Sequence, residues 1–108
     1  DGPADLNQPT ALSGLNLDDV FWGLQESKPQ VIYYDAIGKK LSLTASDYFS
    51  FSVVYTPPPA AFFCVENQSC STNAHNLHNE GLVEEAHLSI LNPGESLKAA
   101  ITFDVSDL

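Results

Sequence analysis

Glu66 is the residue in this chain best placed for chemistry, because it follows the apolar run 62–65 and precedes the polar run 67–69. A carboxylate between a buried strand and a polar loop is partly desolvated, which raises its affinity for a proton. Such a group is suited to act as a general base. The local pattern alone favours a simpler interpretation, in which Glu66 is the first solvated residue after a strand.

Two further acids, Asp18 and Asp19, are adjacent in the sequence. Successive side chains of an extended segment point to opposite faces, so only one of them can enter a given cleft. Several aromatic residues could supply a surface on which a sugar stacks, although most are expected in a core. They are Phe21, Trp22, Tyr33, Tyr34, Tyr55, Phe62 and Phe63.

Histidines and glutamates occur together in a polar stretch and could be considered as metal ligands. The residues are His75, His78, Glu80, Glu84, Glu85 and His87. Their spacing fixes no coordination geometry in a loop, so a solvated loop is favoured and no metal site is expected. Cys64 and Cys70 could close a short disulfide loop, but a buried free thiol at Cys64 is the favoured interpretation.

The elements that would position these residues are strands. Strands are predicted at 17–22, 31–35, 40–44, 49–56, 61–66, 87–91 and 97–105. A turn over 36–39 with Gly38 joins the second and third into a hairpin, and three consecutive prolines at 57–59 impose a bend. A polar loop is expected from 67 to about 85, with one possible short helix over 77–86. This pattern predicts an all-β fold, an antiparallel β-sandwich or barrel.

Composition narrows the classes of partner. The chain has 108 residues, the size of one domain, and is 44% hydrophobic, as a folded protein requires. Its net charge of -10 disfavours nucleic acid and anionic membranes. It contains no Arg, the usual clamp for phosphate, so a neutral or small polar ligand fits better. The chain also lacks Met, a signal-like segment and a long apolar run, so we expect a cytoplasmic piece of a longer protein.

The order of the motifs carries more information than any one of them. The series comprises Leu-Asp-Asp-Val-Phe at 17–21, Val-Val-Tyr-Thr-Pro at 53–57, Phe-x-Cys-x-Glu at 62–66 and Asn-Pro-Gly-Glu at 92–95. Taken in order, these motifs resemble the C-terminal half of the aldose 1-epimerases, the galactose mutarotase family. The resemblance covers nearly the whole chain from about Asp5. It implies that residues 1–108 are a single fragment, the later part of the family's larger β-sandwich, or supersandwich.

The resemblance also implies roles for two residues. Glu66 occupies the place of the catalytic base, which takes a proton from the anomeric hydroxyl of a neutral aldose. Asp18 matches an aspartate that binds sugar hydroxyls, and no cofactor or metal is needed. The family's two catalytic histidines lie in the preceding half, so this chain alone is expected to be inactive. The missing half, or another copy of the chain, would cover the exposed sheet.

Two alternatives remain open. The chain could be a non-catalytic carbohydrate-binding or interaction β-sandwich, which keeps the fold without the chemistry. It could also be a purely structural sandwich domain that binds no aldose. One departure from the family bears on this choice, because Val53 or Val54 stands where some members have a glutamine before the Tyr-Thr pair.

Overall fold

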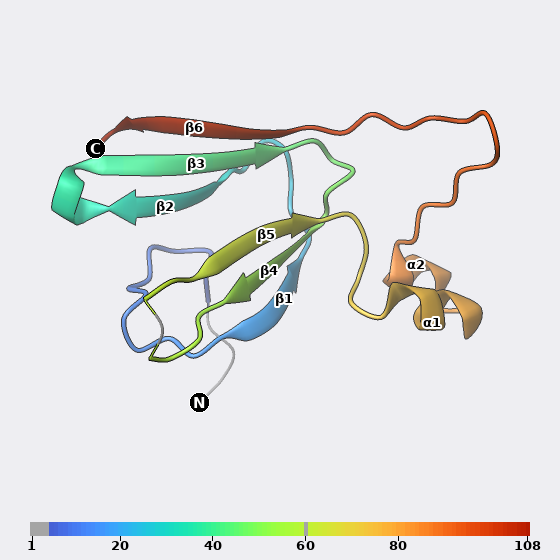
Figure 1. Cartoon of the computed structure of the whole chain (residues 1–108), viewed down its shortest axis with the longest axis horizontal. Coiled ribbons are helices and arrows are strands. Elements are labelled where there is room, and N and C mark those ends of the chain that lie inside the picture. Colours follow the sequence, from blue (N-terminus) through green and yellow to red (C-terminus); the bar gives the residue numbers. More distant parts are fainter. Residues whose placement is uncertain (1–4, 60) are drawn as a thin grey trace.

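A computed structural model describes residues 5–59 and 61–108. Most of the regular structure is β, arranged as two antiparallel sheets of three strands each (Figure 1). The first sheet has the order β1-β4-β5, with β1 at Asp18–Trp22, β4 at Phe51–Tyr55 and β5 at Cys64–Gln68. The second has the order β2-β3-β6, with β2 at Gln30–Tyr34, β3 at Lys39–Ala45 and β6 at Ile101–Asp107. The all-β prediction is therefore correct at this level.

The hairpin of β2 and β3 forms where the sequence predicted it. A 3-10 turn, η1 at Asp35–Ile37, joins the strands and ends at Gly38. Gly38 has φ 66° and ψ 31°, in the left-handed region that glycine adopts without a steric cost. The Gly38 N–H donates to the Asp35 carbonyl at 3.2 Å, which closes the turn.

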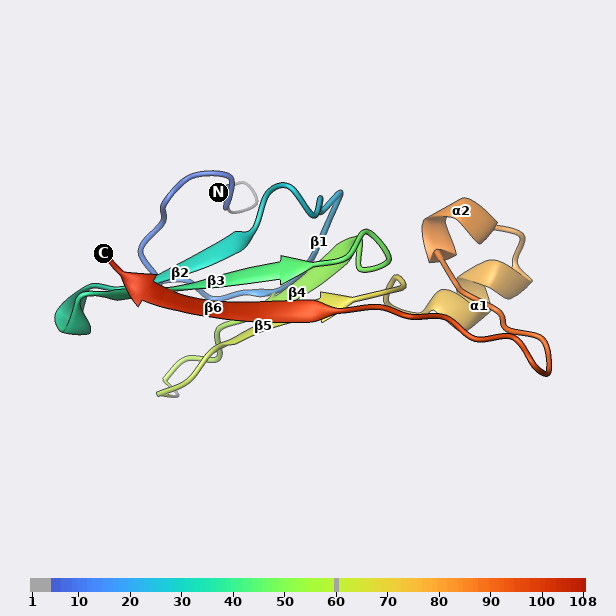
Figure 2. The ribbon, with the colours of Figure 1, turned by 90° about the horizontal axis from the view of Figure 1, so that it is seen from above.

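Two short helices replace most of the predicted polar loop. Helix α1 spans Ala74–Asn79 and α2 spans Val83–Ala86, and the two pack together beside one end of the sheets (Figure 2). The single helix predicted over 77–86 is thus divided at Gly81, which has φ 90°. Ala74 of α1 and Ala86 of α2 are both buried.

Three strand predictions need correction. The strand predicted at 61–66 lies at Cys64–Gln68, because the pairing of β5 with β4 begins with Cys64 opposite Tyr55 and residues 61–63 precede it. No strand forms at 87–91, since His87 instead ends α2 with φ 53° and this segment pairs with no described strand. The last strand begins at Ile101 rather than at 97, because its pairing with β3 begins with Ile101 opposite Ala45.

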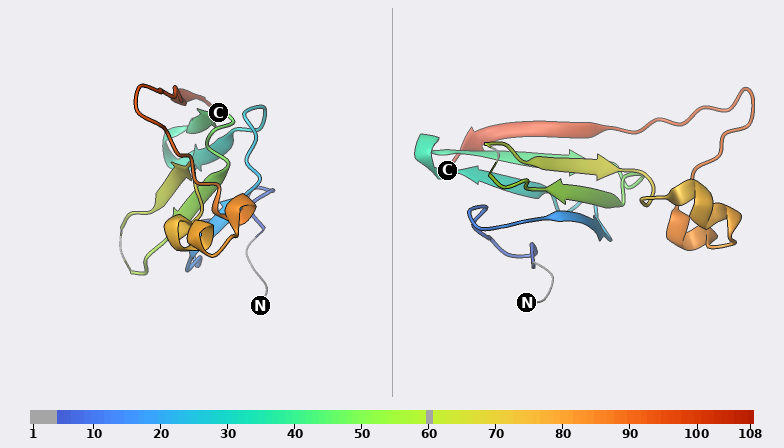
Figure 3. Two further views of the ribbon diagram at one scale, coloured as in Figure 1. Left: turned by 90° about the vertical axis from the view of Figure 1, so that its right-hand side faces the viewer. Right: turned by 60° about the horizontal axis from the view of Figure 1, so that its bottom comes forward.

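The core between the sheets is small. Ser52 and Val54 of β4 are its buried residues in the β1-β4-β5 sheet, and Leu43 of β3 is the buried residue in the β2-β3-β6 sheet. An open groove of about 330 Å³ lies between the sheets. It is lined by Ile32, Tyr34, Leu41, Leu43 and Phe103 of the β2-β3-β6 sheet, and by Ala61, Phe62, Phe63 and Val65 of the β5 strand and its approach. The two sheets are visible from the end and from below in Figure 3.

Candidate functional site

The two faces of the β1-β4-β5 sheet differ in their surroundings. Residues directly opposite each other in antiparallel strands project to the same side, and so does every second residue along a strand. The register therefore divides the sheet into an inner face, which carries buried Ser52 and Val54, and an outer face. The outer face consists of Asp18, Val20, Trp22, Phe51, Val53, Tyr55, Cys64, Glu66 and Gln68.

Glu66 lies at the centre of β5, directly opposite Val53 of β4. The sequence predicted a position at the end of a strand, and this prediction is wrong because the ladder continues to Gln68. Glu66 is also exposed, so the described part of the chain does not supply the desolvation that the sequence suggested. The carboxylate projects from a rigid strand into solvent, with the backbone held on one side by β4.

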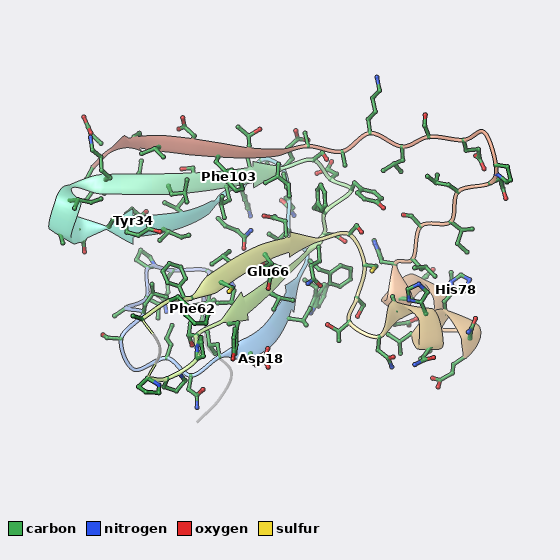
Figure 4. The ribbon with its side chains drawn as sticks, in the orientation of Figure 1. Asp18, Tyr34, Phe62, Glu66, His78 and Phe103 are labelled. Carbon is green, nitrogen blue, oxygen red and sulfur yellow. The ribbon has the colours of Figure 1, made fainter. Side chains whose placement is uncertain are left out.

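Asp18 begins β1 and lies opposite Tyr55, on the same outer face as Glu66 (Figure 4). Two strand spacings across and two residues along place the Cα atoms of Asp18 and Glu66 about 12 Å apart. Asp19 lies opposite Val54 and so belongs to the inner face. The expectation that only one of these two acids can enter a given site is therefore confirmed by the register.

Two exposed aromatic residues share the outer face with the two acids. Trp22, at the end of β1, is 83% exposed, and Tyr55 between Asp18 and Cys64 is 37% exposed. Carboxylates accept hydrogen bonds from hydroxyl groups, and exposed aromatic rings offer apolar surfaces with a preferred stacking geometry. A ligand with hydroxyls at its rim and an apolar face, such as a pyranose sugar, matches this combination.

A backbone and side-chain network positions the first strand. The Thr56 hydroxyl accepts a hydrogen bond from the Leu17 N–H at 2.8 Å and donates to the Leu15 carbonyl at 3.1 Å. The Thr56 N–H also donates to the Leu17 carbonyl at 2.8 Å. These bonds fasten the residue before Asp18 to the end of β4, so they determine where the Asp18 backbone lies on the sheet.

The histidines are divided between two places. His75 and His78 belong to α1, and Figure 4 shows His78 among the helices, away from Glu66 on the sheet. His87 ends α2 in a left-handed conformation. Its ring packs edge-on against the Phe51 ring, with 5.4 Å between the ring centroids. Its Nδ1 lies 3.3 Å from the Ser50 hydroxyl. Sequence reasoning missed this placement beside an outer-face residue, because no local signal reports a contact between residues 36 positions apart.

The remaining titratable groups contribute little to a site. Side-chain hydrogen bonds with Ser89 and Ser69 lower the pKa of Tyr48, which precedes β4. Cys64 and Cys70 are free thiols, and each is half-buried. In residues 5–59 and 61–108, no group of three or more His, Cys, Asp or Glu side chains is arranged to hold a metal ion. The same residues contain no helix that is long and apolar enough to span a membrane.

Comparisons of the chain with protein-family models, with curated proteins and with solved structures found no match.

Proposed function

We propose that this chain is part of an aldose 1-epimerase-like protein and that its outer face contributes to the sugar site. The observation that carries the proposal is the joint placement of Glu66, Asp18, Trp22 and Tyr55 on one face of one sheet. Asp18, Tyr55 and Glu66 fall within the motifs that resemble the family, and the register places all four side chains on one face. The larger fold would be an antiparallel β-sandwich that includes both three-stranded sheets.

In this function Glu66 removes the proton from the anomeric hydroxyl while an acid protonates the ring oxygen. The bond between the anomeric carbon and the ring oxygen breaks, and an open-chain aldehyde forms. Rotation about the neighbouring carbon–carbon bond presents the other face of the aldehyde. Ring closure then returns the proton from Glu66 to the new anomeric hydroxyl and the other proton to the acid, so the reaction is balanced without a cofactor or metal.

The acid has to come from outside the arrangement described here. His75 and His78 lie in α1, apart from Glu66. General acid or base catalysis typically contributes a factor of ~10² to 10⁴, so a base without its acid loses that factor. We therefore expect the 108-residue chain to bind an aldose weakly and to have almost no epimerase activity. A segment of a longer protein would supply the acid and would shield Glu66 from water.

A binding-only function is the alternative, and one observation favours it. Trp22 is 83% exposed on the same face as the exposed Glu66, and sugar stacking and hydrogen bonding need no proton transfer. The two functions differ in the role of Glu66. A binding module needs Glu66 at most for affinity, whereas an epimerase needs it for turnover.

Trp22 is the only tryptophan of the chain, so its fluorescence reports on this face directly. Addition of galactose or glucose should change the emission in a saturable way. Asp18→Asn should weaken that binding about tenfold, because it removes a charged hydrogen-bond acceptor. Polarimetry on the same samples should show mutarotation close to the buffer rate.

Glucuronate is the matched control ligand, since its carboxylate should be repelled by Asp18 and Glu66. A titration in which no aldose changes Trp22 emission or the amide signals of β1, β4 and β5 would exclude both sugar functions. Rapid mutarotation by the isolated chain would instead show that an acid is already present in it.

A further inference from the structure

β6 forms one edge of the β2-β3-β6 sheet, and within residues 5–59 and 61–108 it pairs with β3 alone. Ile101, Phe103 and Val105 of β6 project to the same side as Leu41 and Leu43 of β3. Leu43 is 5% exposed, whereas Phe103 and Val105 are 69% and 67% exposed. The apolar face of this sheet is therefore covered at Leu43 and exposed at β6. Edge strands of this kind readily pair with another strand.

The total surface is also too large for a chain of this mass. The accessible area is 7858 Å², against about 5900 Å² for a folded monomer of 11.7 kDa. The difference is more than twice the roughly 800 Å² that each partner buries in an interface of standard size. There is thus enough uncovered surface for a stable dimer.

We propose that β6 pairs antiparallel with β6 of a second copy of this chain, about a two-fold axis at Ile101. The chain runs extended into β6 from residue 97, and Ala100 still bonds Ser46 through both its N–H and its carbonyl. With the axis at Ile101, Phe103 lies opposite Ala99 of the second copy and Val105 opposite Leu97. The large and small side chains alternate, and the two sheets join into one of six strands.

Several positions of the two-fold axis keep the apolar side chains on one face of the joined sheet. The charged side chains favour the axis at Ile101 among them. With the axis at Ile101, Lys98 of each chain lies opposite Asp104 of the other, which gives two opposite-charge pairs. The same register aligns Asp107 with Glu95, but Glu95 lies in the turn that it closes with Asn92, before the extended segment, and Asp107 forms an ion pair with Lys39. An axis at Asp104 would place the two Asp104 carboxylates face to face, which is destabilising. An axis at Phe103 would leave Asp104 opposite Thr102 and Lys98 opposite Leu108. The two ion pairs also offset part of the repulsion between chains that each carry a net charge of -10.

The proposal concerns the 108-residue chain itself and does not depend on sugar chemistry. The self-complementary register is specific to a second copy, because an unrelated strand would not have to present Lys98 and Asp104 at matching positions.

Sedimentation velocity over a range of concentrations is the direct test. The wild-type chain should sediment as a dimer at micromolar concentration, and Phe103→Lys should raise the dimer dissociation constant by roughly tenfold or more. Val83→Lys is the matched control, since Val83 is an exposed apolar residue of α2, away from β6. It should leave the dimer intact. Circular dichroism checks that each variant remains folded.

Charge reversal tests the register. Lys98→Asp and Asp104→Lys should each weaken the dimer, and the double variant should restore it. The two residues are six positions apart on an extended strand, about 20 Å, so they cannot compensate each other within one chain. A chain that stays monomeric at every concentration, or dimers unaffected by Phe103→Lys, would overturn the proposal. A double variant that fails to recover would overturn the Ile101 axis.

Discussion

Thr56 and Ser52 are two buried hydroxyl residues of the same region, 7% and 1% exposed, but only the Thr56 hydroxyl is hydrogen-bonded within the described residues. Thr56 exchanges hydrogen bonds with Leu15 and Leu17 across about 40 positions of sequence. The Ser52 hydroxyl has no hydrogen-bond partner within the described ranges 5–59 and 61–108. A buried polar group stabilises a fold only when it is paired, so the two residues should respond in opposite ways to loss of the hydroxyl.

Thr56→Val should lower the free energy of unfolding by about 1–3 kcal/mol. Valine keeps the shape but leaves the Leu17 N–H and the Leu15 carbonyl without their partner. Urea denaturation measures the change, and Thr72→Val in the exposed turn before α1 is the matched control, expected within about 0.5 kcal/mol of wild type. Because Thr56 fixes the strand that begins at Asp18, weaker sugar binding should accompany the loss of stability.

Ser52→Ala should instead leave stability unchanged or raise it, by up to about 1 kcal/mol, because it removes an unpaired buried hydroxyl. The same denaturation series measures both variants. A loss of stability as large as that of Thr56→Val would show that Ser52 has a partner in solution, such as a buried water.

Glu66→Gln should lower kcat by a factor of ~10² to 10⁴ in the longer protein that the proposed function requires, with little change in KM. Glutamine keeps the size and the hydrogen bonding of Glu66 but cannot accept the proton. Glu80→Gln, at the exposed end of α1, is the matched control and should have wild-type kinetics. An unchanged kcat in Glu66→Gln would favour the binding-only function.

At the scale of elements, the β2–β3 hairpin depends on its turn, and β5 depends on its neighbour. Gly38 is required by its positive φ, and no atom lies within 4 Å of where a Cβ would stand. Replacement there is therefore opposed by backbone conformation alone. By contrast, the position of β5 follows from its pairing with β4, since Tyr55 opposite Cys64 decides which side of the sheet Glu66 occupies.

Gly38→Ala should reduce stability by about 1–2 kcal/mol, the cost of holding an L-residue in the left-handed region. Gly38→Asn should cost less, since asparagine tolerates this conformation. The ordering glycine, asparagine, alanine in thermal or urea denaturation is the expected result. Equal stability of Gly38→Ala and wild type would mean that the turn adopts another conformation.

At the scale of the whole molecule, the chain is extended for its length. The radius of gyration is 15.9 Å, against about 13 Å for a compact domain of this size. Only Leu17, Leu43, Val54, Ala74 and Ala86 are buried among the described apolar residues. A core this small contributes little stability, so much of the stability of the folded chain should come from what covers its surface.

Thermal stability should therefore depend on protein concentration. If two copies associate through β6, a hundredfold increase in concentration favours the dimer over the unfolded chains, and the midpoint should rise by about 5 °C or more. Differential scanning calorimetry at two concentrations measures this shift. Phe103→Lys should abolish the concentration dependence, and a midpoint that is independent of concentration in the wild-type chain would count against association.

The sequence by itself determined the features that depend on neighbours along the chain. The alternation of Leu41 and Leu43 and the glycine at 38 were enough to locate the β2–β3 hairpin, and the period of two separated Asp18 from Asp19. These signals are local, because side-chain alternation and turn conformation involve residues only a few positions apart.

Only the tertiary structure decided how distant segments meet. The sequence could not show that Glu66 lies in mid-strand and exposed, that 87–91 remains unpaired, or that His87 packs on Phe51. The common face of Glu66, Asp18, Trp22 and Tyr55 follows from the register of three strands, and register is fixed by pairing between residues far apart in sequence. Among the described residues, the same pairing leaves β6 with one unpaired edge and exposed apolar side chains, which no pattern within one strand reveals.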